Sequence, residues 1–156
     1  RFSLRSYSRK ALDQVVERFR KIIEGAALIA DVTYDLKEGD RLANKIPVLK
    51  LNQLLMENAE LVQAPRLSPP REKTGSSDFS NVMYEVPGSC IRVAMVPPGT
   101  SSHSLEFLQA GKGEEAHEAV VIAAKVLCGV ACDLIQEPER LSEIQMEFQN
   151  NKCTNL

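Results

Sequence analysis

The chain has 156 residues, of which 44% are hydrophobic and 26% are charged, so it can bury a core and is not predicted to be disordered. Its formal net charge of -2 argues against nucleic acid or an anionic membrane as the main partner, because binding to those surfaces needs concentrated positive charge. No apolar run approaches the length of a membrane span, and no signal peptide is recognisable. The length suits one ordinary domain or two small ones.

The first forty residues show two alternating segments around a helical one. Residues 1–7 place Phe2 and Leu4 on one face and polar side chains on the other, which predicts a strand. Ser8 is a typical N-cap, and the apolar residues after it recur at helical spacing, which predicts an amphipathic helix of about five turns. Residues 32–37 alternate again and predict a second strand. This β-α-β unit would need further strands to be stable.

The later part of the chain is predicted to be mainly helical. The first expected elements are a helix over 46–61 with Pro47 in its first turn, a Pro- and Ser-rich loop over 64–77, and a short helical turn capped by Asp78. A buried strand is expected over 91–96. A long helix over 114–135 follows, with a core stripe of small apolar residues that includes Val120 and Leu127, and a last helix starts at Pro138.

Four cysteines, Cys90, Cys128, Cys132 and Cys153, show no CxxC pair and no spacing typical of a disulfide framework. Cys128 and Cys132 lie four residues apart in the apolar long helix. The expected state is buried free thiols in a reducing compartment, which favours a cytoplasmic protein, and a metal or redox site is the alternative.

Two loops at the ends of predicted elements hold the residues most suited to chemistry, residues 75–79 and 99–104. His103 is one of only two histidines and lies among small polar residues, where an imidazole could reach a metal and act as a neutral ligand. A solvated loop histidine gives the same pattern. Arg5 is either a solvated charge or a guanidinium directed at a carboxylate, and Asp78 alone would be a helix cap.

The order of four segments carries more information than any one of them. They are "FSLRS", "IIEGAALIADVTYDLK", "GSSDFSNVMYEVPG" and "GTSSHSLEFLQAGKGEEAHEAVVIAAKVL". In this order they resemble the C-terminal part of the zinc-dependent aminoacylase and carboxypeptidase-like metallopeptidases. The most similar branch is that of the aminobenzoyl-glutamate hydrolases and the peptidase-domain-containing dipeptidases. The resemblance extends to about residue 136.

The resemblance implies an α/β fold in two parts. Residues 1–40 would be the C-terminal β-α-β of a ferredoxin-like lid or dimerisation domain, and residues 41–156 the C-terminal segment of a catalytic α/β domain. It also implies a homodimer that cleaves amide bonds of N-acyl amino acids or dipeptides with water activated by a two-zinc site.

The resemblance also implies roles for single residues. His103 falls on the family's last metal ligand, and Arg5 falls on the arginine that contacts the free carboxylate of a small-molecule substrate. The other positions would have a structural role next to the site without binding metal or substrate; they are Gly75, Asp78 and Gly99. Ser77 and Ser80 depart from the family pattern, which has Thr and Gly at these positions, so the shape of that loop is open.

The family's other metal ligands and its general base lie in an upstream His-x-Asp motif, a bridging Asp and a Glu-Glu pair. The chain has no His-x-Asp motif, and its Glu114-Glu115 pair follows His103 at a predicted helix start, where it is better explained as charge that complements the helix dipole. We therefore expect a fragment that is inactive alone, and its start at Arg1 inside a predicted strand agrees with that expectation. The alternative is a non-catalytic binding or dimerisation module that pairs through residues 2–7. An RNA-binding sheet is disfavoured because no aromatic pair offers a stacking platform.

Overall fold

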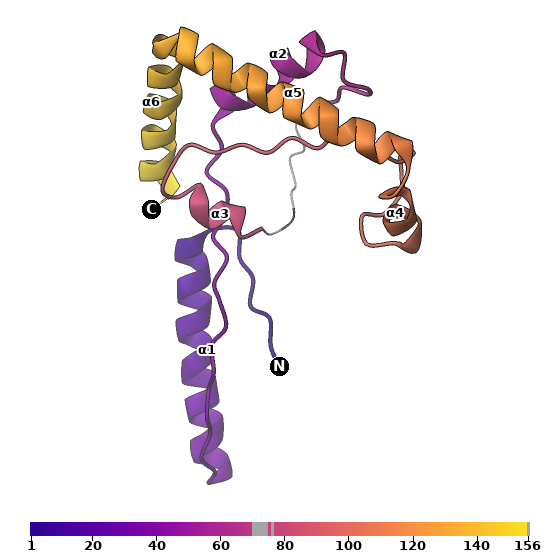
Figure 1. The fold of residues 1–156 in the computed structure, drawn as a ribbon. Helices are drawn as coiled ribbons and strands as arrows, with labels where there is room; N and C mark the ends of the chain where they lie inside the picture. Colours follow the sequence, from indigo (N-terminus) through magenta and orange to yellow (C-terminus); the bar gives the residue numbers. More distant parts are fainter. Residues whose placement is uncertain (70–74, 76, 156) are drawn as a thin grey trace.

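Helices form the regular structure of the chain in the computed structural model, which describes residues 1–69, 75 and 77–155 (Figure 1). In chain order the helices are α1 (Arg9–Ala30), α2 (Leu49–Leu61), α3 (Phe79–Val82), α4 (Leu105–Ala110), α5 (Glu114–Gln136) and α6 (Pro138–Asn155).

The core lies where α2, α5 and α6 pack against one another. Val126 of α5 and Phe148 of α6 are fully or almost fully buried there. Ile46 and Val48, in the chain that leads into α2, are also fully buried. Tyr84, which follows α3, joins the same cluster, so the core gathers segments from residue 46 to residue 148.

A glycine brings α2 and α5 into close contact. A Cβ atom at Gly129 would lie 1.9 Å from Oδ1 of Asn58, so only glycine fits this position of α5 without a shift. Asn58 is buried, and its Nδ2 donates to the Leu54 carbonyl at 3.1 Å and to Asp133 Oδ2 at 2.7 Å. The buried amide is therefore satisfied, as burial of a polar group requires.

The N-terminus of α2 is capped from another helix. Val48, the residue at the N-cap position, makes no side-chain cap. Instead Glu147 of α6 accepts from the backbone N–H groups of Leu49 at 2.8 Å and Lys50 at 2.9 Å. A carboxylate at this end of a helix also interacts favourably with the helix dipole, so this contact ties α6 to α2.

Helix α1 projects away from the packed helices, and the chain after it runs back along its side (Figure 1). The helix begins as predicted, because Ser8 Oγ accepts from the Ala11 N–H at 3.2 Å. It ends at Ala30. The next residue, Asp31, caps the helix: its backbone is left-handed, and its N–H donates to carbonyls of the last turn. Although α1 is strongly amphipathic, none of its residues is buried.

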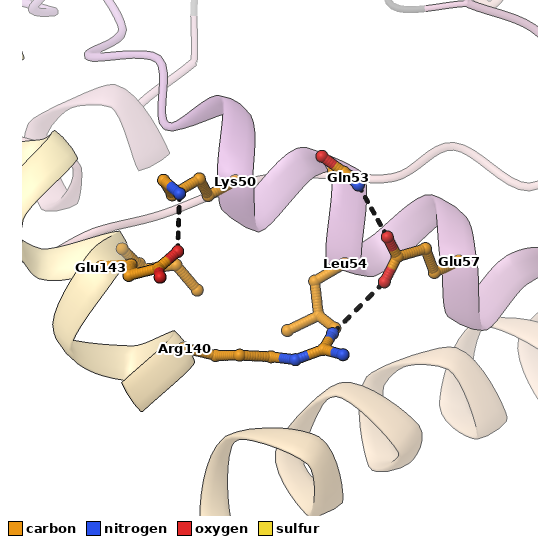
Figure 2. A pocket seen from close by; sticks show the side chains of 7 residues that line it. Lys50, Gln53, Leu54, Glu57, Arg140 and Glu143 are labelled. Carbon is orange, nitrogen blue, oxygen red and sulfur yellow. Dashed lines mark hydrogen bonds and ion pairs between the residues drawn. The ribbon is translucent and has the colours of Figure 1, made fainter. Parts of the chain in front are cut away.

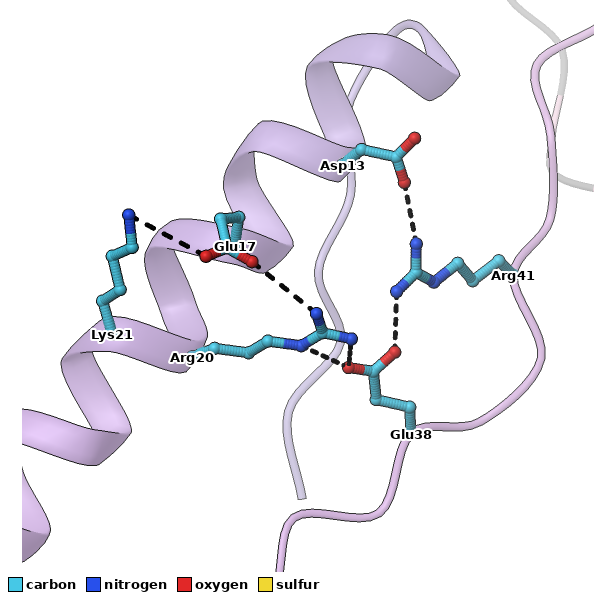
Figure 3. Close-up of polar contacts among 6 residues, drawn as sticks. All are labelled: Asp13, Glu17, Arg20, Lys21, Glu38 and Arg41. Carbon is cyan, nitrogen blue, oxygen red and sulfur yellow. Dashed lines mark hydrogen bonds and ion pairs between the residues drawn. The ribbon is translucent and has the colours of Figure 1, made fainter.

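Ion pairs hold the returning segment against α1 (Figure 3). Arg41 binds Asp13 at 2.8 Å and Glu38 at 2.7 Å, and Arg20 also binds Glu38. These contacts lower the pKa of Glu38, with the hydrogen bond from Arg41 contributing most, and raise the pKa of Arg41. Because all these side chains reach solvent, salt screens the interactions.

The predicted α/β architecture is wrong for this chain. Residues 1–7, 32–37 and 91–96, which were expected to be strands of a lid and of a catalytic sheet, form no strand in the described structure. A strand is stable only when a neighbouring strand accepts its backbone hydrogen bonds, and no backbone hydrogen bond joins these described segments. The alternating pattern is compatible with a strand, but it does not determine whether a neighbouring strand is present. The domain boundary after residue 40 stays a prediction.

Two further expectations need correction. Helix α2 starts at Leu49 and not at 46, because the residue before a proline avoids the helical conformation and Ile46 precedes Pro47. The four cysteines are free, as expected, but they are exposed and not buried. Helix α5 buries the face that contains Val126 and Val130, and leaves the cysteines and also Val120 and Leu127 outside.

Among the residues that the structure describes, no helix combines the length and the apolar character needed to cross a lipid bilayer.

Candidate functional site

His103 lies on an exposed turn immediately before α4. Its backbone N–H donates to Ser101 Oγ at 3.4 Å, and Ser104 caps α4 by accepting from the Phe107 N–H at 3.2 Å. The pKa of Glu106 in the first turn of α4 is lowered because its carboxylate accepts from its own backbone N–H and from the Ser104 hydroxyl. Local bonds thus fix the backbone around His103, and the imidazole is left at the surface.

Gly99 turns the chain before this histidine. Its φ angle is +91°, in the left-handed region that favours glycine. The Thr100 N–H donates to the Pro97 carbonyl at 3.3 Å, so residues 97–100 form a turn with Pro98 and Gly99 at its centre, the arrangement typical of type II. A Cβ on Gly99 would meet no atom within 4 Å, so the requirement is conformational and not steric.

Asp78 acts as a helix cap. Its Oδ1 accepts from the Phe79 N–H at 2.9 Å and lies 3.3 Å from the Ser77 hydroxyl, at the start of α3. Gly75 is exposed, with open space around the position of a Cβ. Ser76, in the same motif, lies outside the described residues. The loop therefore serves to start α3 in this structure.

The described structure does not assemble the predicted site residues. Arg5 is exposed in the segment before α1, and no hydrogen bond or ion pair joins Arg5, Asp78 and His103 in the described part of the chain. The N-terminal segment and α4 lie well apart (Figure 1). Over the described ranges, no group of three or more His, Cys, Asp or Glu side chains could hold a metal ion. These residues therefore do not fit a two-zinc centre on their own.

A polar groove between α2 and α6 was not predicted from the sequence (Figure 2). It has a volume of about 260 Å³, and its charged lining residues pair across it. Lys50 Nζ lies 2.6 Å from Glu143 Oε2, and Arg140 lies 3.3 Å from Glu57. In the sequence these charged residues have the spacing of a solvated helix face, so the pattern does not indicate that they pair between two helices.

The charges in the groove neutralise one another. The hydrogen bond with Glu143 raises the pKa of Lys50, and Lys50 lowers the pKa of Glu143. The pKa of Arg140 is raised chiefly by its hydrogen bond to Glu137, with a smaller effect of Glu57. Because every charged group that faces the groove already has an opposite partner, the groove is a contact between helices and is a poor site for an ionic ligand.

A second, smaller pocket of about 150 Å³ lies at the foot of α1. Its walls are the first turn of α1, residues 41–43, and the region of α3 with Tyr84 and Glu85. It thus lies where α1 meets the chain that leads to the packed helices.

Comparison with known proteins supports a peptidase-like origin. The chain is 27% identical to a human Xaa-Arg dipeptidase over 152 residues, an alignment that covers 95% of this chain and 35% of the human protein. The mouse Xaa-Arg dipeptidase is 26% identical with the same coverage. No family model matches the chain. The chain thus spans 35% of the length of these relatives and is similar to them at a low level of identity, in agreement with the dipeptidase part of the resemblance.

Proposed function

We propose that the chain is the C-terminal part of a metal-dependent dipeptidase or amidohydrolase that cleaves amide bonds of dipeptides or N-acyl amino acids. The observation that carries this proposal is the alignment of 95% of the chain with dipeptidases about three times as long. The four segments quoted above, three of which contain Arg5, Asp78 and His103, agree with it, because their order resembles that of the metallopeptidase family.

In this proposal the chain contributes two functional groups. His103 is one metal ligand, on a turn whose backbone is fixed by Gly99 and by the start of α4. Arg5 binds the free carboxylate of the substrate, for which a guanidinium is suited by its paired donors. Gly75 and Asp78 support the site through the local structure before α3. The remaining ligands and the general base would come from polypeptide that this chain does not contain.

Zinc is the proposed metal, because a site with histidine and carboxylate ligands favours zinc over magnesium. The substrate class follows from the relatives, whose name describes dipeptides that end in arginine. We propose a similar small peptide with a free C-terminal carboxylate, a homodimeric complete protein and a cytoplasmic location.

The test uses the longest natural polypeptide that contains this sequence. We expect it to bind zinc and to hydrolyse dipeptides that end in arginine. His103→Ala should remove about one zinc ion per chain and lower kcat by about 100-fold or more, because the ion activates the attacking water. His117→Ala is the matched control, since His117 is exposed on α5, and it should keep both zinc and activity. Unchanged zinc content and kcat in His103→Ala would contradict the assignment.

A second candidate is a non-catalytic binding or dimerisation module. It is supported by α1, which has an apolar face but no buried residue, and by exposed side chains such as Ile22 and Tyr34. Surfaces of this kind are common at protein interfaces. If the natural polypeptide binds no zinc and forms a dimer that Ile22→Asp dissociates, this second function is favoured.

A further inference from the structure

Helix α1 is connected to the rest of the molecule by polar contacts. Here the arm denotes residues 1–42 and the body the described residues from 43 to 155. The packed helix pairs are α2 with α5, α2 with α6 and α5 with α6, so α1 is in none of them. Hydrogen bonds cross from arm to body at Asn44, which accepts from the Arg9 N–H, and at Asn81, which donates to the Arg41 carbonyl.

The Asn81 side chain makes two hydrogen bonds to the backbone of the connecting chain. Its Oδ1 accepts from the Ala43 N–H at 2.7 Å, and its Nδ2 donates to the Arg41 carbonyl at 3.2 Å. Because both bonds come from one planar amide, they fix the direction of the chain between these residues as well as its position.

The Asn44 side chain joins the start of α1 to Tyr84. Its Oδ1 accepts from the Arg9 N–H at 3.0 Å and from the Tyr84 hydroxyl at 2.7 Å. The Arg9 guanidinium also lies over the Tyr84 ring, 5.7 Å from its centroid, which is within the range of a cation–π contact.

Both sides of these contacts are held in place. On the body side, Tyr84 is buried, and its carbonyl accepts from Lys152 of α6. On the arm side, Arg41 is bound to Asp13 of α1. Between the two sides lies the pocket of about 150 Å³, which residues of both sides line.

We propose that Asn81, together with Asn44, forms a polar joint that fixes the direction of the arm relative to the body. Asn81 is a positioning residue in this joint. The inference rests on the contacts alone and does not depend on the proposed function. If the proposed function also holds, the joint sets the position of Arg5, on the arm, relative to His103, on the body.

The test measures the distance between arm and body by pulsed electron spin resonance. The parent carries Ser in place of the four cysteines, and spin labels at the exposed positions Glu24→Cys and Gln145→Cys. We expect one narrow distance distribution in the parent. Asn81→Ala should widen it by about twofold or more, because the connecting chain then loses both bonds of the amide.

Two further variants make the result specific. Gln53→Ala is the matched control, since the Gln53 amide donates to Glu57 of the same helix and makes no contact with the arm among the described residues, and it should leave the distribution unchanged. Asn81→Asp keeps an acceptor for Ala43 but loses the donor to Arg41, so an intermediate width is expected. If Asn81→Ala loses helical signal in circular dichroism, the width measured for Asn81→Asp tests the proposal in its place. The inference is overturned if neither Asn81 variant changes the distribution, or if the parent is already as wide as Asn81→Ala.

Discussion

Helices α1 and α5 have almost the same length, 22 and 23 residues, and both carry an apolar face. Helix α5 buries Ala116, Ala119, Val126 and Val130 against its neighbours, whereas α1 buries no residue. Most of the stability of a helix in a protein comes from packing of its apolar face. The body should therefore unfold cooperatively, and the arm should depend on its cap, its ion pairs and the polar joint.

An apolar face alone does not make a core. The second apolar face of α5 shows the same point within the body, because Val120 is 68% exposed and Leu127 is 56% exposed. In the body, α2 meets the consecutive helices α5 and α6, and the three helices exclude water from the faces that they share. In the arm, α1 meets the N-terminal segment and the returning segment, and these leave all its residues at least partly exposed.

The largest expected difference in stability between the two regions comes from truncating one phenylalanine in each. Phe148 is 2% exposed in the body core, and Phe148→Ala should lower the free energy of unfolding by about 3–5 kcal/mol. Phe19 is half-buried on α1, where its ring lies 5.1 Å from the ring of Phe2, and Phe19→Ala should cost about 1 kcal/mol or less. Urea unfolding followed by circular dichroism measures both. Equal losses would refute the distinction between the regions.

A smaller effect is expected from a methyl group added to a glycine in each region. Gly129→Ala should destabilise the body by about 1–3 kcal/mol, because the new Cβ would lie 1.9 Å from Asn58 Oδ1. Gly25 lies within α1 with no atom within 4 Å of a Cβ, so Gly25→Ala should be neutral or stabilise α1 by about 0.5–1 kcal/mol. Thermal unfolding gives the comparison. A stable Gly129→Ala variant would show that α2 and α5 pack less closely than described.

The smallest expected effects concern two exposed glutamates with lowered pKa values. Glu143 interacts with Lys50 in the body, and Glu38 with Arg41 in the arm. Since the folded pKa lies below the unfolded one, each contributes stability that is complete above the unfolded pKa of about 4.3 and is lost as the pH falls through the folded pKa.

At about pH 7, Glu143→Gln should lower the Tm slightly, and the difference from the unmodified chain should shrink as the pH falls below about 4. Glu38→Gln should leave the Tm of the body unchanged, because Glu38 stabilises only the arm, but it should speed hydrogen exchange in α1. Each effect should weaken in about 1 M salt, because both pairs are exposed. A Tm difference for Glu143→Gln that grows on acidification has the wrong sign for this explanation.

The sequence predicted the helices that have strong periodicity and clear end signals. Helix α1 begins after Ser8, and α6 begins at Pro138, as expected. Helix α4 was missed, although Ser104 provides a cap, because the helix is only six residues long and ends at Gly111. Strand patterns at 1–7, 32–37 and 91–96 misled the prediction, since a strand also needs a partner that a local pattern cannot specify.

The candidate site was predictable only in its local parts. The turn at Gly99 and the cap at Asp78 follow from residue types whose backbone preferences are strong. The contacts of Asn81 with residues about forty positions away, and the pairing of Lys50 with Glu143, depend on tertiary structure and leave no pattern in the sequence. The roles of Arg5 and His103 come from a resemblance and stay predictions.

We propose that this chain works as part of a longer dipeptidase-like polypeptide. The most direct test is the intact mass of the polypeptide that cells produce from this gene, captured with an antibody against residues 114–136 and measured by mass spectrometry. We predict a mass well above the 17.3 kDa of this chain, in a protein that binds zinc. A mass of 17.3 kDa would contradict the claim, because this chain alone holds only one of the expected metal ligands.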